Sequence, residues 1–217
     1  MKNRQFSSQE QQTLRDLILL RRDIRGNNFL PDEITDQQIN ELITAASLGP
    51  SVGYSQPWEF VVIKDNDIKK QVHQSFATET KIAADKFSTE KQALYHQLKL
   101  EGILEAPINI AVFYKEPNEP ILGQNSMAEA GEYSVVCAIQ NMWLMARSMN
   151  LGLGWVSIIN PETVKTIVNA PQDRKLVAYL CLGYVKEFHS VPELETLKWE
   201  SRKPIESFTF SQSYPID

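Results

Sequence analysis

Cysteine, histidine, long apolar runs and excess positive charge are all scarce in this 217-residue sequence. Asp and Glu number 27 against 22 Lys and Arg, a formal charge of -5, so a broad nucleic-acid-binding surface is not expected. Apolar runs are all broken well short of the roughly 20 residues that a membrane-spanning helix needs. The polar stretch at residues 1–12 does not resemble a secretory signal. These features predict a cytoplasmic protein with no membrane or nucleic-acid partner.

The few sulfur and imidazole groups do not indicate a metal site. Cys137 and Cys181 each lie inside an apolar run, which favours buried free thiols in a reducing compartment over a disulfide. His73, His96 and His189 are scattered without the spacing of metal ligands. A Walker loop and a GxGxxG turn after a strand are also absent, so a nicotinamide dinucleotide on a Rossmann unit is not supported.

Helical and extended patterns alternate along the whole chain, and they predict one mixed domain over residues 1–217 around a single sheet. A polar start followed by apolar residues at helical spacing marks most of the helices, and short apolar runs mark the strands. The expected helices cover residues 8–22, 35–48, 67–76, 79–102 and 133–149, with a short one opened by Asn160 and Pro161. The expected strands cover residues 60–63, 108–114, 153–159 and 176–184.

Two segments suggest contacts with a second subunit. The helix at 133–149 is apolar on nearly all sides, which predicts burial all round, and a subunit interface would explain this. The last thirty residues carry three prolines and end in an extended 208–210 stretch, more like an arm than a core element. Such an arm often packs on a partner chain.

The densest basic cluster lies where the first helix ends. Arg21, Arg22 and Arg25 fall within five residues, and their guanidinium groups could surround a phosphate dianion. The alternative is a solvated helix end, where arginine complements the helix dipole. Asp23 lies among them and could be paired with a neighbouring arginine.

Three further segments could contribute to a site, and each also has an ordinary structural explanation. Residues 50–58 place small residues between a helix and a strand, which suits a planar ligand or a simple turn. Residues 152–157 carry two glycines that would let a strand run beside a ring and present Ser157, or would simply end a helix. The basic pair Arg202 and Lys203 is ordinarily solvated surface.

Taken together and in this order, six motifs resemble the nitroreductase superfamily: RRDIRG, PSVGYSQPW, LKLEGILEAP, YSVVCAIQNMWLMA, GLGWVS and the late Arg202-Lys203-Pro204. The resemblance covers about residues 14–210. It implies an α+β fold with a central, mainly antiparallel sheet flanked by helices. It also implies a domain-swapped homodimer with a C-terminal exchange arm that holds FMN at the subunit interface.

The resemblance also assigns roles to individual positions. It implies that arginines hold the FMN phosphate and ribityl chain, and that the loop after the second helix lines the ring. The implied flavin-binding residues are Arg21, Arg22, Asp23, Ile24, Arg25, Ser51, Val52, Gly53, Tyr54, Leu100, Ser157 and Arg202. No metal is implied.

Asp23 and Tyr54 indicate one branch of the superfamily. Ordinary members usually have Ser or Thr at the position of Asp23, and Asn at the position of Tyr54. The branch implies oxygen-dependent fragmentation of reduced FMN to 5,6-dimethylbenzimidazole and erythrose 4-phosphate. Asp23 and Ser157 are then the catalytic residues, and residues 86–100 resemble a lid. A flavin reductase or NAD(P)H would supply the reduced flavin. Lys86 departs from the apolar residue expected at its lid position.

Two other functions remain open at this point. An NAD(P)H-dependent FMN oxidoreductase of the same fold would reduce nitro compounds, quinones or enones, and it would need an open ring face. A non-catalytic protein that stores or delivers FMN would use the same binding residues. Turnover, as opposed to stoichiometric binding, separates this last possibility from the two enzymes.

Overall fold

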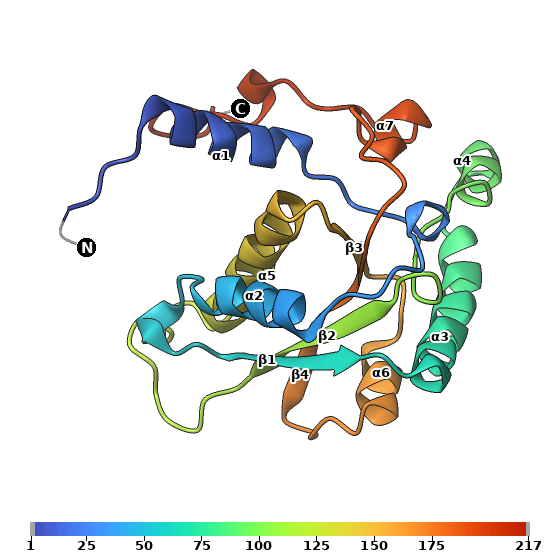
Figure 1. The fold of residues 1–217 in the computed structure, drawn as a ribbon, viewed down its shortest axis with the longest axis horizontal. Helices are drawn as coiled ribbons and strands as arrows, with labels where there is room; N and C mark the ends of the chain where they lie inside the picture. The colour runs from blue at the N-terminus through green and yellow to red at the C-terminus, as the bar shows by residue number, and fades with distance from the viewer. Residues whose placement is uncertain (1–2, 216–217) are drawn as a thin grey trace.

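A four-stranded sheet lies at the centre of the computed structural model, which describes residues 3–215 (Figure 1). Neighbouring strands are antiparallel throughout and follow the order β1-β2-β4-β3. Strand β3 therefore lies at an edge of the sheet, and its outer backbone groups are available to bond with a segment outside the sheet. The strands are β1 (Trp58–Ile63), β2 (Ile108–Lys115), β3 (Gly152–Val156) and β4 (Arg174–Gly183).

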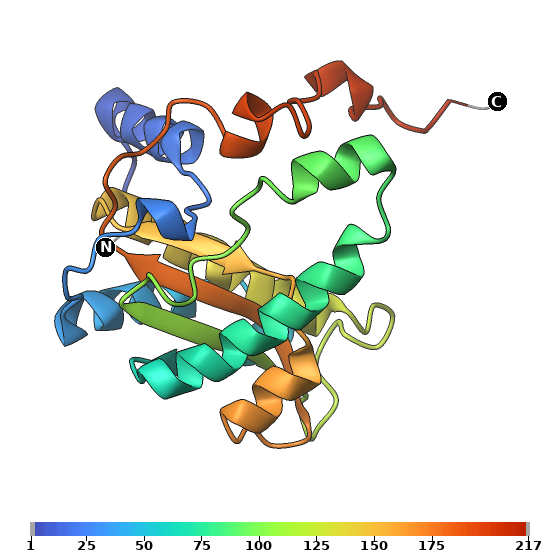
Figure 2. The same cartoon turned by 90° about the vertical axis from the view of Figure 1, so that its right-hand side faces the viewer.

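Helices cover both faces of the sheet, which confirms the α+β prediction (Figure 2). One apolar core lies between the sheet and helices α2 and α5, and the other lies between the sheet and helices α3 and α6. The helices are α1 (Ser8–Leu20), α2 (Asp36–Ser47), α3 (Asn66–Ala84), α4 (Thr89–Tyr95), α5 (Ala130–Ser148), α6 (Pro161–Ile167) and α7 (Glu193–Thr196).

Local sequence signals set several of these boundaries. Thr35 and Gln38 form the predicted capping box at the start of α2, each side chain bonding to the backbone N–H of the other. Asn160 caps α6 and Pro161 occupies its first turn, also as predicted. In β2, alternate side chains enter the two cores, which is the two-residue period of a strand buried on both faces.

Between residues 76 and 107 the structure differs from the prediction. Helix α3 continues to Ala84 where an end near residue 76 was expected. Within the expected 79–102 helix, only the end of α3 and the short helix α4 are helical. Residues 98–103 are not helical because their backbone groups bond elsewhere. The Glu101 carbonyl accepts from the Gly26 N–H at 2.7 Å, and the Glu101 carboxylate accepts from the Ile103 N–H at 2.7 Å.

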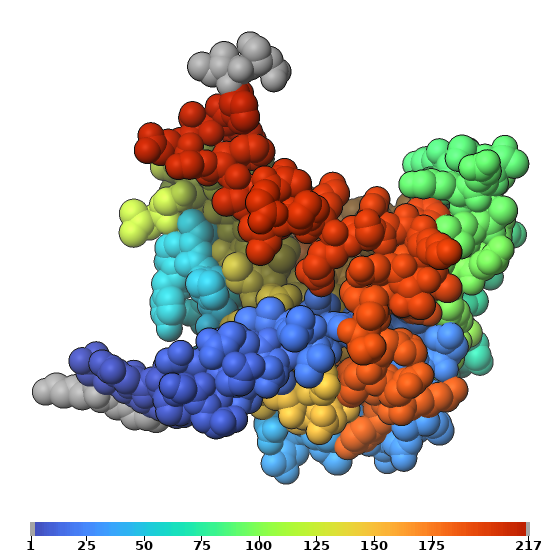
Figure 3. Space-filling view, turned by 90° about the horizontal axis from the view of Figure 1, so that it is seen from above, coloured from blue at the N-terminus to red at the C-terminus, as the bar shows by residue number. Residues whose placement is uncertain are grey.

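Helix α5 is buried on one side only in this single chain, and burial of its other side was predicted to involve a subunit interface. Its inner face packs on the sheet and α2, but Tyr133 remains 56% exposed and Val136 41% exposed. Helix α1 has no buried residue although it carries four leucines and one isoleucine. Residues 205–215 run away from the sheet along the same side of the molecule as α1 (Figure 3). The chain therefore exposes three apolar segments.

The prediction of two free thiols is confirmed, and the prediction that both are buried is confirmed for one of them. Both thiols are free, with Cys181 buried and Cys137 half-buried. Burial raises the pKa of the Cys181 thiol, which makes it unreactive. Within residues 3–215, no helix is long and apolar enough to cross a bilayer, and no group of acidic, histidine and cysteine side chains is arranged to hold a metal ion.

Candidate active site

A cavity of about 510 Å³ opens where α1 ends, between residues 21–25 and the segment that follows β4. We call it the arginine cavity, because five guanidinium groups line it together with two carboxylates and an apolar wall. It lies on the face seen in Figure 3, between α1 and the C-terminal segment. The lining residues are Arg15, Ile18, Leu19, Arg21, Arg22, Asp23, Arg25, His189, Pro192, Glu193, Leu194 and Arg202.

Asp23 is held against the outer side of the edge strand β3. It forms a parallel bridge with Leu153, and its Oδ1 accepts from the Trp155 N–H at 2.9 Å. The other carboxylate oxygen pairs with Arg25. Burial raises the pKa of Asp23, while Arg25 and the Trp155 N–H oppose the increase. A carboxyl group in this setting can exchange protons nearer neutral pH than an ordinary aspartate.

Gly154 allows this close approach. A Cβ at this position would lie 2.1 Å from the Ile24 carbonyl oxygen, a backbone atom that cannot move without displacing Asp23. We expect Gly154→Ala to lower the free energy of unfolding in urea by about 1–3 kcal/mol, the usual range for overpacking. Gly152→Ala is the matched control, because its Cβ would press on the Val185 side chain and not on backbone. Equal losses in the two variants would contradict this explanation.

The predicted arginines do not all face the cavity in the same way. The Arg21 guanidinium lies 4.7 Å from the centre of the Trp143 ring and forms no ion pair within residues 3–215. Arg25 pairs with Asp23 and donates to the Leu100 carbonyl at 3.0 Å. The predicted residue Leu100 therefore contributes a backbone oxygen that orients Arg25. Arg21 and Arg202 are the predicted arginines available to a ligand.

Arg22 has a different role from the one expected, because backbone carbonyls occupy its guanidinium. It donates to the carbonyl of His189 at 2.9 Å, to Ser190, and to Leu19 and Arg21 at 2.7 Å each. Burial lowers the pKa of Arg22, with further lowering by nearby arginines. This side chain ties the end of α1 to the segment that follows β4.

We therefore expect Arg22→Gln to lower the free energy of unfolding by about 1–3 kcal/mol, because it removes the donor from four partly buried hydrogen bonds. Its flavin affinity should change less than about threefold. Arg15→Gln is the matched control on exposed helix α1, where the stability should hold within about 0.5 kcal/mol. Calorimetry of both variants and flavin titration of Arg22→Gln check this. A large loss of flavin affinity without a loss of stability in Arg22→Gln would contradict the assignment.

Ser157 lies at the end of β3 and lines a different, smaller cavity of about 210 Å³. We call it the serine cavity; Glu79 and Lys86 from the lid side also line it. Ser157 follows Trp155 by two residues, so it lies about 7 Å further along the edge to which Asp23 is bonded. The carboxylate of Asp23 and the side chain of Ser157 therefore lie near the same end of β3, although they line different cavities.

The loop carrying Ser51, Val52, Gly53 and Tyr54 lies apart from both cavities. It forms a short 3-10 turn between α2 and β1, at the end of the molecule away from α7 (Figure 1). The Val52 N–H donates to Ser134 at 3.0 Å, and Tyr54 is 82% exposed. The structure therefore does not bring this loop to the arginines within one chain. The Ile24 side chain is buried in the core on the α3 and α6 side of the sheet and does not line the arginine cavity.

Three charged residues that line these cavities were not predicted from the sequence: Arg15, Glu193 and Glu79. Arg15 had a usable signal, because Arg15, Ile18 and Leu19 recur at helical spacing on one face of α1. Glu193 and Glu79 had none, since their place depends on where α7 and α3 pack.

The chain belongs to the nitroreductase family, whose model matches residues 18–184. It is 43% identical over 190 residues to the 5,6-dimethylbenzimidazole synthase of Rhodospirillum rubrum, covering 87% of this chain and 89% of that protein. Among solved structures, iodotyrosine deiodinase bound to FMN and 3-iodo-L-tyrosine superposes with a TM-score of 0.74 at 18% identity, covering 93% of this chain and 100% of that one. A BluB-like flavoprotein from Clostridium difficile 630 superposes with a TM-score of 0.69 at 24% sequence identity, covering 92% of this chain and 99% of that one.

Proposed function

We propose that this chain is a 5,6-dimethylbenzimidazole synthase, which breaks down reduced FMN with oxygen and releases erythrose 4-phosphate as the second product. The observation that carries the proposal is Asp23, a carboxylate with a raised pKa held on the edge of β3 beside the arginine cavity. The 43% identity to the Rhodospirillum rubrum synthase over most of both chains supports it. The product is the lower ligand of cobalamin.

The arginine cavity fits a flavin phosphate by size and by charge. Its volume of about 510 Å³ lies within the range of about 300–1,000 Å³ that is usual for ligand sites. Arg15, Arg21 and Arg202 form no ion pair within residues 3–215, so their donors are available to a phosphate dianion. Ile18 and Leu19 provide an apolar wall. In this arrangement Asp23 would face the ribityl chain and the ring.

Reduced FMN, when bound, supplies the electrons for oxygen and the ring carbons of the product. Asp23 accepts and returns protons during ring and ribityl cleavage, because its ionised form is made more basic by burial. The Ser157 hydroxyl, just beyond the end of β3, would donate a hydrogen bond to the ring edge. Residues 86–100, which we call the lid segment, exclude bulk water and a nicotinamide from the ring.

We propose that a second copy of the chain completes the site. Helix α1 and the outer face of α5 expose apolar side chains, and the 51–54 loop lies far from Asp23 in its own chain. A two-fold dimer would cover these surfaces and bring each loop to the other copy's cavity. The C-terminal arm, with Phe208 and Phe210 exposed, would pack on the partner.

Subunit mixing tests this arrangement. Asp23→Asn removes the acid, and Gly53→Val distorts the loop, because Gly53 has φ 54 and a Cβ there would lie 2.6 Å from Ile121. Each variant alone should be inactive. After unfolding and refolding together, half of the dimers carry one intact site, so about a quarter of the wild-type activity should return. No recovery would place the acid and the loop in the same chain's site.

An NAD(P)H-dependent flavin reductase, or NAD(P)H itself, supplies the reduced flavin in this proposal, which places the reaction in the cytoplasm. The direct test is to load the protein with chemically reduced FMN without oxygen, admit air, and analyse the products. 5,6-Dimethylbenzimidazole is expected. Clean reoxidation to FMN would instead favour an oxidoreductase that turns over NAD(P)H with nitro compounds or quinones, or a protein that only stores flavin.

A further inference from the structure

Three aromatic rings join the lid segment to the chain that follows α7. Phe87 and Tyr95 lie in the lid segment, with ring centres 5.2 Å apart. The Trp199 ring meets Phe87 edge-on at 5.2 Å and Tyr95 at 6.2 Å. The ammonium group of Lys91, on α4, lies 5.3 Å from the centre of the Trp199 ring. Helix α4 lies beside α7 in both Figure 1 and Figure 2.

This aromatic cluster is the main attachment of α4 to the rest of the molecule. Among the described helices and strands, α4 has no extensive packing partner. A helix of seven residues is marginal in water by itself, so its position depends on tertiary contacts. Tyr95 is only 5% exposed, and Trp199 and Phe87 cover it. Removing the Trp199 ring would leave the lid segment without a surface to close on.

The Trp199 backbone is fixed on the side of the arginine cavity. Its N–H donates to the Leu194 carbonyl at 2.8 Å, which closes the turn after α7. Leu194 itself lines the arginine cavity, and so does Arg202, three residues beyond Trp199. The same short segment therefore carries a guanidinium toward the cavity and an aromatic ring toward the lid.

We propose that Trp199 is a positioning residue that couples phosphate binding at Arg202 to closure of the lid segment. This rests on the proposed binding of FMN. A phosphate held by Arg202 fixes residues 199–202, and the fixed Trp199 ring then holds Phe87, Tyr95 and Lys91. Because coupling between two sites is reciprocal, lid closure strengthens FMN binding by the same factor. Riboflavin, which has no phosphate, would leave the lid segment open.

Hydrogen–deuterium exchange of residues 88–98 tests this with oxidised flavins and no turnover. In the wild type, FMN should slow exchange by about tenfold, and riboflavin by less than about threefold. Trp199→Ala should lose the FMN-dependent protection and bind FMN about tenfold more weakly, with riboflavin affinity unchanged. Trp199→Phe should restore part of both. FMN-dependent protection that persists in Trp199→Ala, or equal protection by riboflavin in the wild type, would overturn the proposal.

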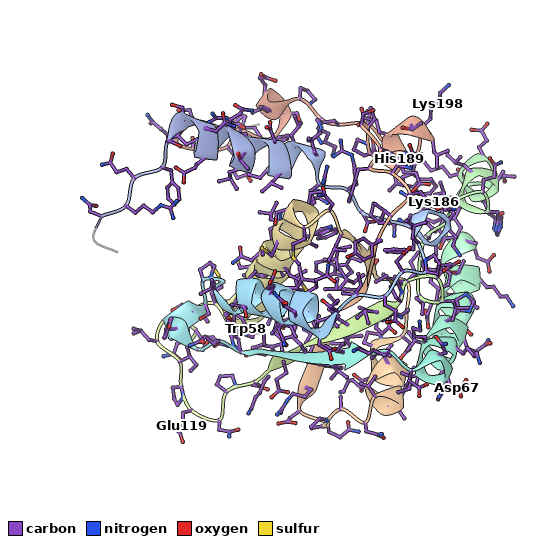
Figure 4. All side chains as sticks on the ribbon, viewed as in Figure 1. Trp58, Asp67, Glu119, Lys186, His189 and Lys198 are labelled. Carbon is purple, nitrogen blue, oxygen red and sulfur yellow. The ribbon has the colours of Figure 1, made fainter. Side chains whose placement is uncertain are left out.

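A second pair of variants keeps the test decisive if Trp199→Ala does not fold. Lys91→Gln removes the cation over the ring, and Lys198→Gln removes an equal charge from a residue that points away from the molecule (Figure 4). In Lys91→Gln, the FMN-dependent protection should be about two- to fivefold smaller than in the wild type. In Lys198→Gln, it should equal that of the wild type. Equal behaviour of the two would count against the coupling. Exchange and binding do not depend on product formation, so failure of the proposed reaction would be seen separately.

Discussion

Asp23→Asn should abolish formation of 5,6-dimethylbenzimidazole while the protein still binds FMN within about threefold of the wild type. The amide keeps the shape of the side chain and can still accept from the Trp155 N–H, but it cannot accept a proton. Loss of a proton-transferring group costs about 10²–10⁴-fold in rate. Single-turnover product analysis after loading with reduced FMN measures this. A normal rate in the variant would remove Asp23 from the mechanism.

The raised pKa of Asp23 also predicts how the rate depends on pH. If the ionised carboxylate accepts the first proton, the rate falls as the pH drops through its pKa, which lies above the ordinary value of about 3.9. Asp23→Glu, which keeps the carboxyl group, should retain such an acid limb at reduced rate. An acid limb at the ordinary aspartate value in the wild type would contradict the assignment.

The same shift has a consequence for stability. Because the pKa is raised, the folded protein binds this proton more tightly than the unfolded chain, so stability falls as the pH rises toward the raised value. At pH 7 the ionised carboxylate is therefore a net cost to folding. Asp23→Asn should be at least as stable as the wild type at pH 7, and its advantage should disappear in acid. Urea unfolding at several pH values checks this.

Arg202→Ala should weaken FMN binding by about 10–150-fold, the equivalent of one charge-assisted hydrogen bond worth about 1.5–3 kcal/mol. Riboflavin binding should be unchanged, because it carries no phosphate. Arg202→Lys should recover part of the affinity, since lysine keeps the charge but not the forked donors. Fluorescence titration with both flavins gives the result. Equal losses for FMN and riboflavin would show that Arg202 does not contact the phosphate.

The sequence could predict what depends on neighbours along the chain. The capping box at Thr35, the proline at the start of α6 and the core strands follow from local spacing, and the structure contains them. Each of these depends on a short pattern whose physical preference is strong.

What could not be predicted depends on contacts between distant residues. Arg21 and Arg22 are adjacent and alike in sequence, but only Arg22 is occupied by the carbonyls of His189 and Ser190. The aromatic cluster joins Phe87 to Trp199, more than 100 residues later, and neither residue belongs to a recognisable motif. The 51–54 loop was placed at the flavin by resemblance, and because it lies apart from the arginines in one chain we propose that a second copy completes the site.

The central claim is that flavin is consumed as a substrate, and a mass balance for one turnover tests it most directly. The protein is loaded without oxygen with one equivalent of reduced FMN per site, exposed to air, and sampled for FMN and 5,6-dimethylbenzimidazole, with Asp23→Asn beside it. We predict that the wild type loses flavin and gains 5,6-dimethylbenzimidazole in equal amounts, whereas Asp23→Asn returns FMN. Full recovery of FMN from the wild type, with no product, would contradict it.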